Sequence, residues 1–177
     1  TLLMTFLEFG SNYDNFAKSF RVTLFQTLAI ITTTGFGLED YEMWAPASQM
    51  IIFGLLFFGG CAGSTSGGVK IIRLFILLKF SFKEITRLLH PNAISLIRMG
   101  DSVIDKKIVL NVAGFFVTYV FLTVVSSIVL SFMGLDFTTA LSAAATSISN
   151  VGPGFGSIGP TENFAHLPDT AKWLLSF

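Results

Sequence analysis

Thr33-Thr34-Gly35-Phe36-Gly37 and Asn150-Val151-Gly152-Pro153-Gly154 are two stretches of this 177-residue chain that share the pattern x-x-Gly-x-Gly. Each follows an apolar segment, residues 20–32 and 137–149, which is long enough for a helix of roughly three to four turns but too short to cross a membrane. A fixed offset in the numbering superimposes the two segments and both pairs of glycines. The sequence therefore predicts an internal repeat of a short helix followed by a glycine-containing loop.

The composition indicates a membrane protein. Hydrophobic residues make up 52% of the chain and charged residues only 12%, whereas soluble domains carry about 25% charged residues. The mean hydropathy is +0.71. The net charge is zero, which gives no electrostatic case for binding nucleic acid. A single cysteine, Cys61, excludes an intramolecular disulfide and a cysteine zinc cage.

One segment has the length of a clean membrane span, and a second is interrupted. Residues 108–133 hold no charged residue and would reach roughly 39 Å as a helix, beyond a hydrocarbon core of about 30 Å. Residues 47–58 would reach only about 18 Å before a Gly/Ser-rich stretch at 59–68, after which helical character resumes from about 69 to 82. We expect one membrane helix broken in its middle. Because irregular backbone at that depth must be enclosed by protein or line a water-filled cavity, the break indicates the conduction route.

The expected fold class is an all-α integral membrane protein with pore-loop repeats around an ion pore. Each repeat would consist of a spanning helix, a re-entrant half-helix, a filter loop and a second spanning helix. Residues 1–82 form one repeat with a truncated first helix, residues 83–107 a connection, and residues 108–177 a second repeat with a truncated last helix. We therefore interpret the chain as a fragment of a longer protein.

The distribution of charge predicts the orientation in the membrane. Eight of the eleven basic residues lie between the broken helix and the clean span, which places this connection in the cytoplasm by the positive-inside rule. The loops after the two filters are acidic and would face outward, and Tyr41, Trp44 and Trp173 are expected in the outer interfacial belt. The basic residues are Lys70, Arg73, Lys79, Lys83, Arg87, Arg98, Lys106 and Lys107, and the acidic ones are Glu39, Asp40, Glu42, Glu162 and Asp169.

The two loops have the features of a carbonyl-lined cation filter, similar to the Thr-Val-Gly-Tyr-Gly loop of potassium channels. The C-terminal end of each half-helix would carry about half a negative charge toward the membrane centre. Successive carbonyls that point one way need backbone angles that glycine adopts cheaply, and this demand is expected at the four loop glycines. The alternative is that these are ordinary turn glycines. The expected K⁺ ligands are the backbone carbonyls of Thr33, Thr34, Gly35, Phe36, Gly37, Asn150, Val151, Gly152, Pro153 and Gly154, with the side-chain oxygens of Thr33 and Asn150 as possible additions.

Pro153 stands where the first loop has Phe36, and its ring fixes φ near −65°. This departure breaks the symmetry of a simple four-fold channel and makes weaker or less selective ion binding plausible.

The Gly/Ser-rich loop is expected just below the filter on the cytoplasmic side. Our hypothesis is a movable gate, and the alternative is a static kink that allows close helix packing. Lys70, at its end, would be an electrostatic barrier or a side chain that extends to the inner interface. The residues assigned to this gate loop are Gly59, Gly60, Cys61, Ala62, Gly63, Ser64, Thr65, Ser66, Gly67, Gly68 and Lys70.

Four motifs together resemble the TrkH/Ktr family of potassium uptake proteins, over nearly the whole chain. Gly59-Gly60-Cys61-Ala62-Gly63-Ser64-Thr65-Ser66-Gly67-Gly68-Val69-Lys70 is the most specific of them. The others are Thr33-Thr34-Gly35-Phe36-Gly37, His90-Pro91-Asn92-Ala93 and Ser149-Asn150-Val151-Gly152-Pro153-Gly154.

The resemblance implies that the chain contains the third and fourth of four pore-loop repeats around one pore. It further implies a multi-pass protein of the prokaryotic inner (plasma) membrane that forms a homodimer, takes up K⁺, and closes its pore with the intramembrane loop. A cytoplasmic nucleotide-binding subunit of the TrkA/KtrA type would regulate it, docking in part on the basic connection. The partners implied are thus the lipid bilayer, the remaining repeats and this subunit, with no nucleic acid.

Two other functions stay open at this stage. Broken helices also build the substrate sites of Na⁺-coupled secondary transporters, and the chain could belong to a non-conducting regulatory membrane subunit. The absence of an ionisable residue from the core of residues 108–133 argues against a proton-coupled carrier or membrane enzyme. We expect no enzymatic activity and no covalently bound cofactor, with K⁺ as the transported ion.

Overall fold

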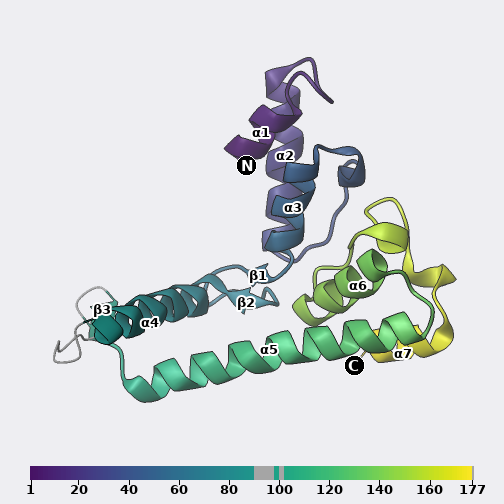
Figure 1. The fold of residues 1–177 in the computed structure, drawn as a ribbon. Helices are drawn as coiled ribbons and strands as arrows, with labels where there is room; N and C mark the ends of the chain where they lie inside the picture. Colours follow the sequence, from purple (N-terminus) through teal and green to yellow (C-terminus); the bar gives the residue numbers. More distant parts are fainter. Residues whose placement is uncertain (90–97, 100–101, 177) are drawn as a thin grey trace.

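The computed structural model describes residues 1–89, 98–99 and 102–176, and it is mostly helical. Figure 1 shows three helices grouped at the N-terminal end and a long helix, α5, along which the other helices lie. The elements in order are α1 (Leu2–Glu8), α2 (Phe16–Ile31), η1 (Tyr41–Met43), α3 (Pro46–Leu55), β1 (Phe58–Gly59), β2 (Val69–Lys70), α4 (Ile71–Leu89), β3 (Arg98–Met99), β4 (Ser102–Val103), α5 (Lys106–Phe132), α6 (Phe137–Ser149), η2 (Gly156–Ile158), η3 (Phe164–His166) and α7 (Asp169–Leu175).

Helix α5 is the predicted clean span. Its 27 residues give a length of about 40 Å. In the described part of the chain, it is the one helix long and apolar enough to cross a membrane, judged by length and composition. The side chain of Asp105 accepts a hydrogen bond from the Lys107 amide and so caps the N-terminus of this helix.

The two half-helices form where the apolar segments predict them. Helix α6 covers residues 137–149, as expected, because Asp136 caps its start and Asn150 ends it in the left-handed conformation. Helix α2 begins at Phe16, four residues earlier than predicted. The side chain of Asn15 accepts a hydrogen bond from the Ala17 amide and thereby adds a turn that apolar periodicity alone does not reveal.

The broken helix departs from the prediction in two respects. Helix α4 runs on to Leu89, well past residue 82 and into the predicted connection, and it leaves the loop in a different direction from α3 (Figure 1). Short strands also interrupt the expected all-α fold. Strands β1 and β2 pair in parallel, with Phe58 opposite Val69, and join the two ends of the loop. The predicted motif at residues 90–93 lies outside the described residues.

Small and aliphatic side chains bring the elements of the second repeat together. Helix α6 packs beside the C-terminal half of α5, and α4 lies along its N-terminal half (Figure 1). Ala143 and Ala144 are fully buried, and Leu130 of α5 belongs to the same cluster. Near the other end of α5, Ile76 packs with Val109 and Val112.

The predicted interfacial belt is wrong for two of its three aromatic residues. Tyr41 is 0% exposed and Trp44 is 4% exposed, whereas Trp173 is 70% exposed. Tyr41 and Trp44 belong to the cluster that packs α1, α2 and α3 together, and Phe155 of the second repeat joins the same cluster. These two rings stabilise the protein interior instead of lying at a lipid interface.

Candidate functional site

The two glycine-containing loops, which we call the first filter loop (residues 33–37) and the second filter loop (residues 150–154), lie directly against each other. A Cβ atom at Gly35 would overlap the carbonyl oxygen of Val151 and would come within 3.2 Å of the Pro153 ring. A Cβ atom at Gly152 would lie 3.9 Å from the Cα atom of Gly35. The fold thus brings together two segments that are far apart in the sequence, and Gly35 is required by this close approach.

The two filter loops also share their hydrogen-bond pattern. The Thr34 amide donates to the Ala29 carbonyl at 3.0 Å, and the Val151 amide donates to the Thr146 carbonyl at 2.9 Å. The amides of Thr33 and Asn150 likewise donate to the carbonyl three residues earlier in their own half-helices. Corresponding partners differ by the same offset in each case, so each loop folds back on its half-helix in the same way.

Left-handed backbone occurs at the first and third positions of each filter loop. The φ angles are 55° at Thr33 and 68° at Gly35, and 60° at Asn150 and 111° at Gly152. Side chains disfavour this region, above all β-branched ones such as that of Thr33. A threonine held there is unusual and indicates that its surroundings determine its conformation.

The prediction that all four loop glycines meet a demand for left-handed backbone is wrong for Gly37 and Gly154. Neither has a positive φ. Each is instead a place without room for a side chain, since a Cβ atom would lie 3.0 Å from the Pro160 carbonyl oxygen at Gly37 and 2.6 Å from Ile158 Cδ1 at Gly154.

Some carbonyls of the filter loops accept a hydrogen bond and are called occupied here, and those that accept none are called open. The Pro153 carbonyl accepts a hydrogen bond from Thr146 Oγ1 at 3.2 Å, and the Gly154 carbonyl accepts one from the Tyr41 hydroxyl at 2.6 Å. Within the described residues, the eight other loop carbonyls accept no hydrogen bond, which leaves them free for water or a ligand. The open carbonyls belong to Thr33, Thr34, Gly35, Phe36, Gly37, Asn150, Val151 and Gly152.

Residues of both loops border a common cavity of about 530 Å³. Its lining includes Thr33, Thr34, Asn150, Val151 and Gly152. Phe36 is instead 68% exposed, and Gly154 is buried away from the cavity. The structure therefore gathers five of the ten predicted filter residues around one space.

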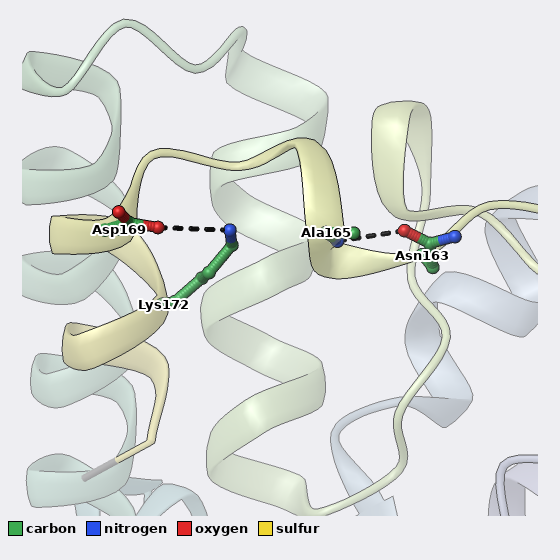
Figure 2. A network of polar contacts seen from close by, with 4 residues as sticks. All are labelled: Asn163, Ala165, Asp169 and Lys172. Atoms are coloured by element: carbon green, nitrogen blue, oxygen red, sulfur yellow. Dashed lines mark hydrogen bonds and ion pairs between the residues drawn. The ribbon is translucent and has the colours of Figure 1, made fainter.

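A lysine of α7 also borders this cavity. The ammonium group of Lys172 lies 3.2 Å from Asp169 Oδ1, and Figure 2 shows the two side chains pointing toward each other across the first turn of α7. The preceding turn, η3, is closed by the Asn163 side chain, which accepts from the Ala165 amide. The ion pair offsets a positive charge that would otherwise repel a cation from the cavity.

The predicted gate loop, residues 59–68, lies against the start of both filter loops. A Cβ atom at Gly67 would overlap the Ser149 carbonyl oxygen at the end of α6. The Gly67 amide donates to Thr33 Oγ1 at 3.3 Å, and this hydroxyl is one of the two side-chain oxygens expected as additional ligands. On the other side, a Cβ atom at Gly60 would lie 3.7 Å from the Ile31 carbonyl at the end of α2. The loop thus contacts the C-terminal ends of both half-helices.

Hydroxyl groups and one lysine hold the gate loop in its compact form. Ser66 Oγ accepts a hydrogen bond from the Gly60 amide at 2.8 Å and lies 2.7 Å from Ser64 Oγ. The ammonium group of Lys70 donates to the carbonyls of Ala62 at 3.0 Å and Ser64 at 2.8 Å. Its positive charge therefore lies on the loop itself, and the side chain does not extend away to an interface.

Sequence reasoning missed several residues that surround the second filter loop. Thr146 Oγ1 accepts a hydrogen bond from the Gly152 amide at 2.9 Å, and Ser142 Oγ bonds both the amide and the carbonyl of Phe155. Thr146 lies about one helical turn before the second filter loop, and this position in the sequence could have indicated it. Nothing in the sequence indicates Tyr41, whose partner is far away along the chain.

Glu42, beside Tyr41, lies in an acidic environment that raises the pKa of its carboxyl above the usual value. Burial is the main cause, and the charges of Asp40, Glu162 and Asp136 add to it, while the hydrogen bond from the Gly156 amide acts in the opposite direction. This carboxylate reaches from the end of the first filter loop to the segment that follows the second.

Comparison with known proteins identifies the family. A family model for TrkH, a cation transport protein, matches residues 5–177. The Trk system potassium uptake protein TrkI of Halomonas elongata is 41% identical over 176 residues, which cover 98% of this chain and 35% of that protein. The Trk system potassium uptake protein TrkH of Escherichia coli K12 is 33% identical over 169 residues, covering 96% of this chain and 35% of that protein.

A solved structure has the same fold. The crystal structure of the potassium transporter TrkH from Vibrio parahaemolyticus matches with a TM-score of 0.89 and 36% identity, covering 98% of this chain and 37% of that one. The chain spans about a third of the length of the curated relatives that it matches. From the family match over nearly its whole length and from this shared membrane-transporter fold, the chain belongs to the TrkH family of cation transport proteins.

Proposed function

We propose that this chain supplies two of the pore loops of a potassium uptake protein, in which dehydrated K⁺ passes a filter of backbone carbonyls. The observation that carries the proposal is the contact between the two filter loops at Gly35 and Gly152, with eight open carbonyls in the two loops. Carbonyl oxygens can replace the hydration shell of an alkali cation. The C-terminal ends of α2 and α6 add partial negative charge at the same place.

The set of K⁺ ligands that we propose is smaller than the ten residues of the two five-residue patterns. They are the open carbonyls of residues 33–37 and 150–152, since those of Pro153 and Gly154 already accept hydrogen bonds. The gate loop below would block the exit while its contacts with Ser149 and Thr33 persist.

The proposal extends to the whole protein. These residues would form the third and fourth repeats of a multi-pass homodimer in a prokaryotic inner membrane. Uptake would be driven by the membrane potential, without covalent chemistry. A nucleotide-binding subunit of the TrkA/KtrA type would act from the cytoplasmic side. Relatives with the same fold carry the name of potassium uptake proteins, which supports the choice of ion.

The test is complementation of a potassium-uptake-deficient bacterium by the complete reading frame that encodes this chain. Gly152→Ser and Gly35→Ser are expected to abolish growth at low K⁺, because each places a side chain at a left-handed residue in the contact between the loops. Gly114→Ser is the control, since open space surrounds this glycine on α5.

Growth of the Gly152→Ser strain equal to that of the unmutated strain would remove the filter from the mechanism and favour a regulatory subunit. A Na⁺-coupled transporter would instead show substrate-stimulated Na⁺ uptake and a potassium flux unaffected by Gly35→Ser.

A further inference from the structure

Two side chains that follow the first filter loop reach across to the second. The Tyr41 hydroxyl donates to the Gly154 carbonyl, and the Glu42 carboxylate accepts from the Gly156 amide. We propose that Tyr41 and Glu42 are positioning residues that fix the outer end of the second filter loop against the first repeat and thereby determine cation selectivity. This inference rests on the proposed function and concerns how the filter keeps its width.

Tyr41 is placed to hold Gly154 rigidly. Its side chain is fully buried, and its ring packs on that of Phe155 with centroids 5.1 Å apart. The amide of Gly154 donates in turn to the Ile158 carbonyl at 2.8 Å. Gly154 is therefore held at both its amide and its carbonyl. Because Gly154 is only two residues beyond Gly152, a shift of Gly154 would be passed on to the open carbonyls.

Glu42 acts on the next turn of the same segment. Its carboxylate accepts from the Gly156 amide, and its Oε2 atom would lie only 2.9 Å from a Cβ atom at Gly159. The glycine at position 159 lets the carboxylate approach this closely. The second filter loop is thus flanked on its outer side by a segment that Glu42 holds in place.

The turn that carries both side chains is itself well fixed. Asp40 Oδ1 accepts a hydrogen bond from the Glu42 amide at 3.0 Å. The Gln49 side chain donates to the Glu42 carbonyl at 2.6 Å and to the Trp44 carbonyl at 2.9 Å. Tyr41 and Glu42 consequently act from a rigid support, as a positioning role requires.

The first repeat has these two polar side chains, and the second repeat has no equivalent ones at the corresponding positions. The offset that superimposes the filter loops places Ile158 on Tyr41 and Gly159 on Glu42, and neither of these offers a polar side chain. Among the described residues, no other hydrogen bond joins residues 33–60 to residues 137–176. The hydrogen bonds of Tyr41 and Glu42 are therefore the polar connection between the two repeats at the level of the filter.

The test measures K⁺ and Na⁺ flux through the complete transporter in proteoliposomes. Tyr41→Phe keeps the ring and its packing but removes the hydrogen bond, and it should lower the K⁺/Na⁺ flux ratio about fivefold, the size expected for one lost hydrogen bond. Glu42→Ala should lower the ratio similarly. Glu42→Gln, which retains an acceptor oxygen, should keep it near the wild-type value.

Tyr13→Phe is the matched control. Tyr13 is also a buried tyrosine near the outer side, but its hydroxyl bonds Glu39 within its own repeat, so the ratio should not change. If Tyr41→Phe and Glu42→Ala leave the ratio unchanged while Gly152→Ser lowers it, the positioning role is overturned and the filter stands. Equal losses of both fluxes in Tyr41→Phe also overturn it. If Gly152→Ser changes neither flux, the proposed function itself fails.

Discussion

At the scale of single residues, glycine serves two separate purposes around the filter. Gly35 and Gly152 adopt left-handed backbone, whereas Gly37 and Gly154 provide space for a neighbouring segment. The x-x-Gly-x-Gly pattern marks both glycines of each loop, but it cannot separate the two purposes. The separation depends on Pro160, which approaches Gly37 from the other repeat, and on Ile158, which folds back on Gly154 from the following turn.

The gate loop offers a test at this scale, because it contains one crowded and one open glycine. Gly67→Ala places a methyl group against the Ser149 carbonyl, whereas nothing lies within 4 Å of a Cβ atom at Gly63. If the closed loop blocks the pore, Gly67→Ala should raise the resting K⁺ flux about tenfold, the ratio that corresponds to ~1.4 kcal/mol against the closed state.

Flux of ⁸⁶Rb⁺ into proteoliposomes without any regulatory subunit measures this effect, with Gly63→Ala as the control. Resting fluxes that do not differ between the two variants, at equal amounts of folded protein, would contradict the gate and favour the static kink.

At the scale of elements, capping residues and apolar patterns explain which helix boundaries could be predicted from the sequence. Helix α6 begins and ends where its apolar segment does, since Asp136 and Asn150 mark its ends. Helix α2 is longer than predicted because Asn15 caps it before the apolar pattern starts. The direction of α4 could not be predicted, since it depends on the pairing of β1 with β2 and on packing against α5.

The buried face of α6 is made of small residues, which lets this half-helix approach α5 closely. Ala144→Leu should therefore overpack the cluster around Leu130 and destabilise the protein by about 1–3 kcal/mol. Thr138→Leu, at an exposed position of the same helix, should change the stability by less than about 0.5 kcal/mol.

Thermal unfolding of the complete protein in detergent measures both variants of α6. Equal melting temperatures for the two would show that α6 is not packed as described.

At the scale of the whole molecule, the resemblance at four motifs led to the TrkH family, which the comparisons confirm. Composition and charge indicated a membrane protein and its orientation, because these properties sum over many residues. The connection between the repeats was less predictable. The contact of Gly35 with Val151, the packing of Phe155 on Tyr41 and the hydrogen bonds of Tyr41 and Glu42 all join residues more than a hundred positions apart.

The predicted orientation can be tested by labelling with a membrane-impermeant maleimide in intact cells. Met43 follows the first filter loop and is 75% exposed, and Leu88 lies near the end of α4 and is 82% exposed. In a background with Cys61→Ser and no other reactive cysteine, Met43→Cys should be labelled from outside. Leu88→Cys should be labelled only after the cells are permeabilised, because Leu88 follows Lys83 and Arg87 in the basic connection that the positive-inside rule places in the cytoplasm. The reverse pattern would invert the topology.

The short parallel pair of β1 and β2 has a mechanical consequence for transport. Since Phe58 pairs with Val69, the intervening ten residues form a closed ring whose base does not depend on the distance between α3 and α4. A change in the shape of this ring would exchange the hydrogen bonds that Ser64, Ser66 and Lys70 make within it, while the helices on either side stay in place. If the loop gates the pore as proposed, opening would therefore not require the surrounding membrane to be rearranged.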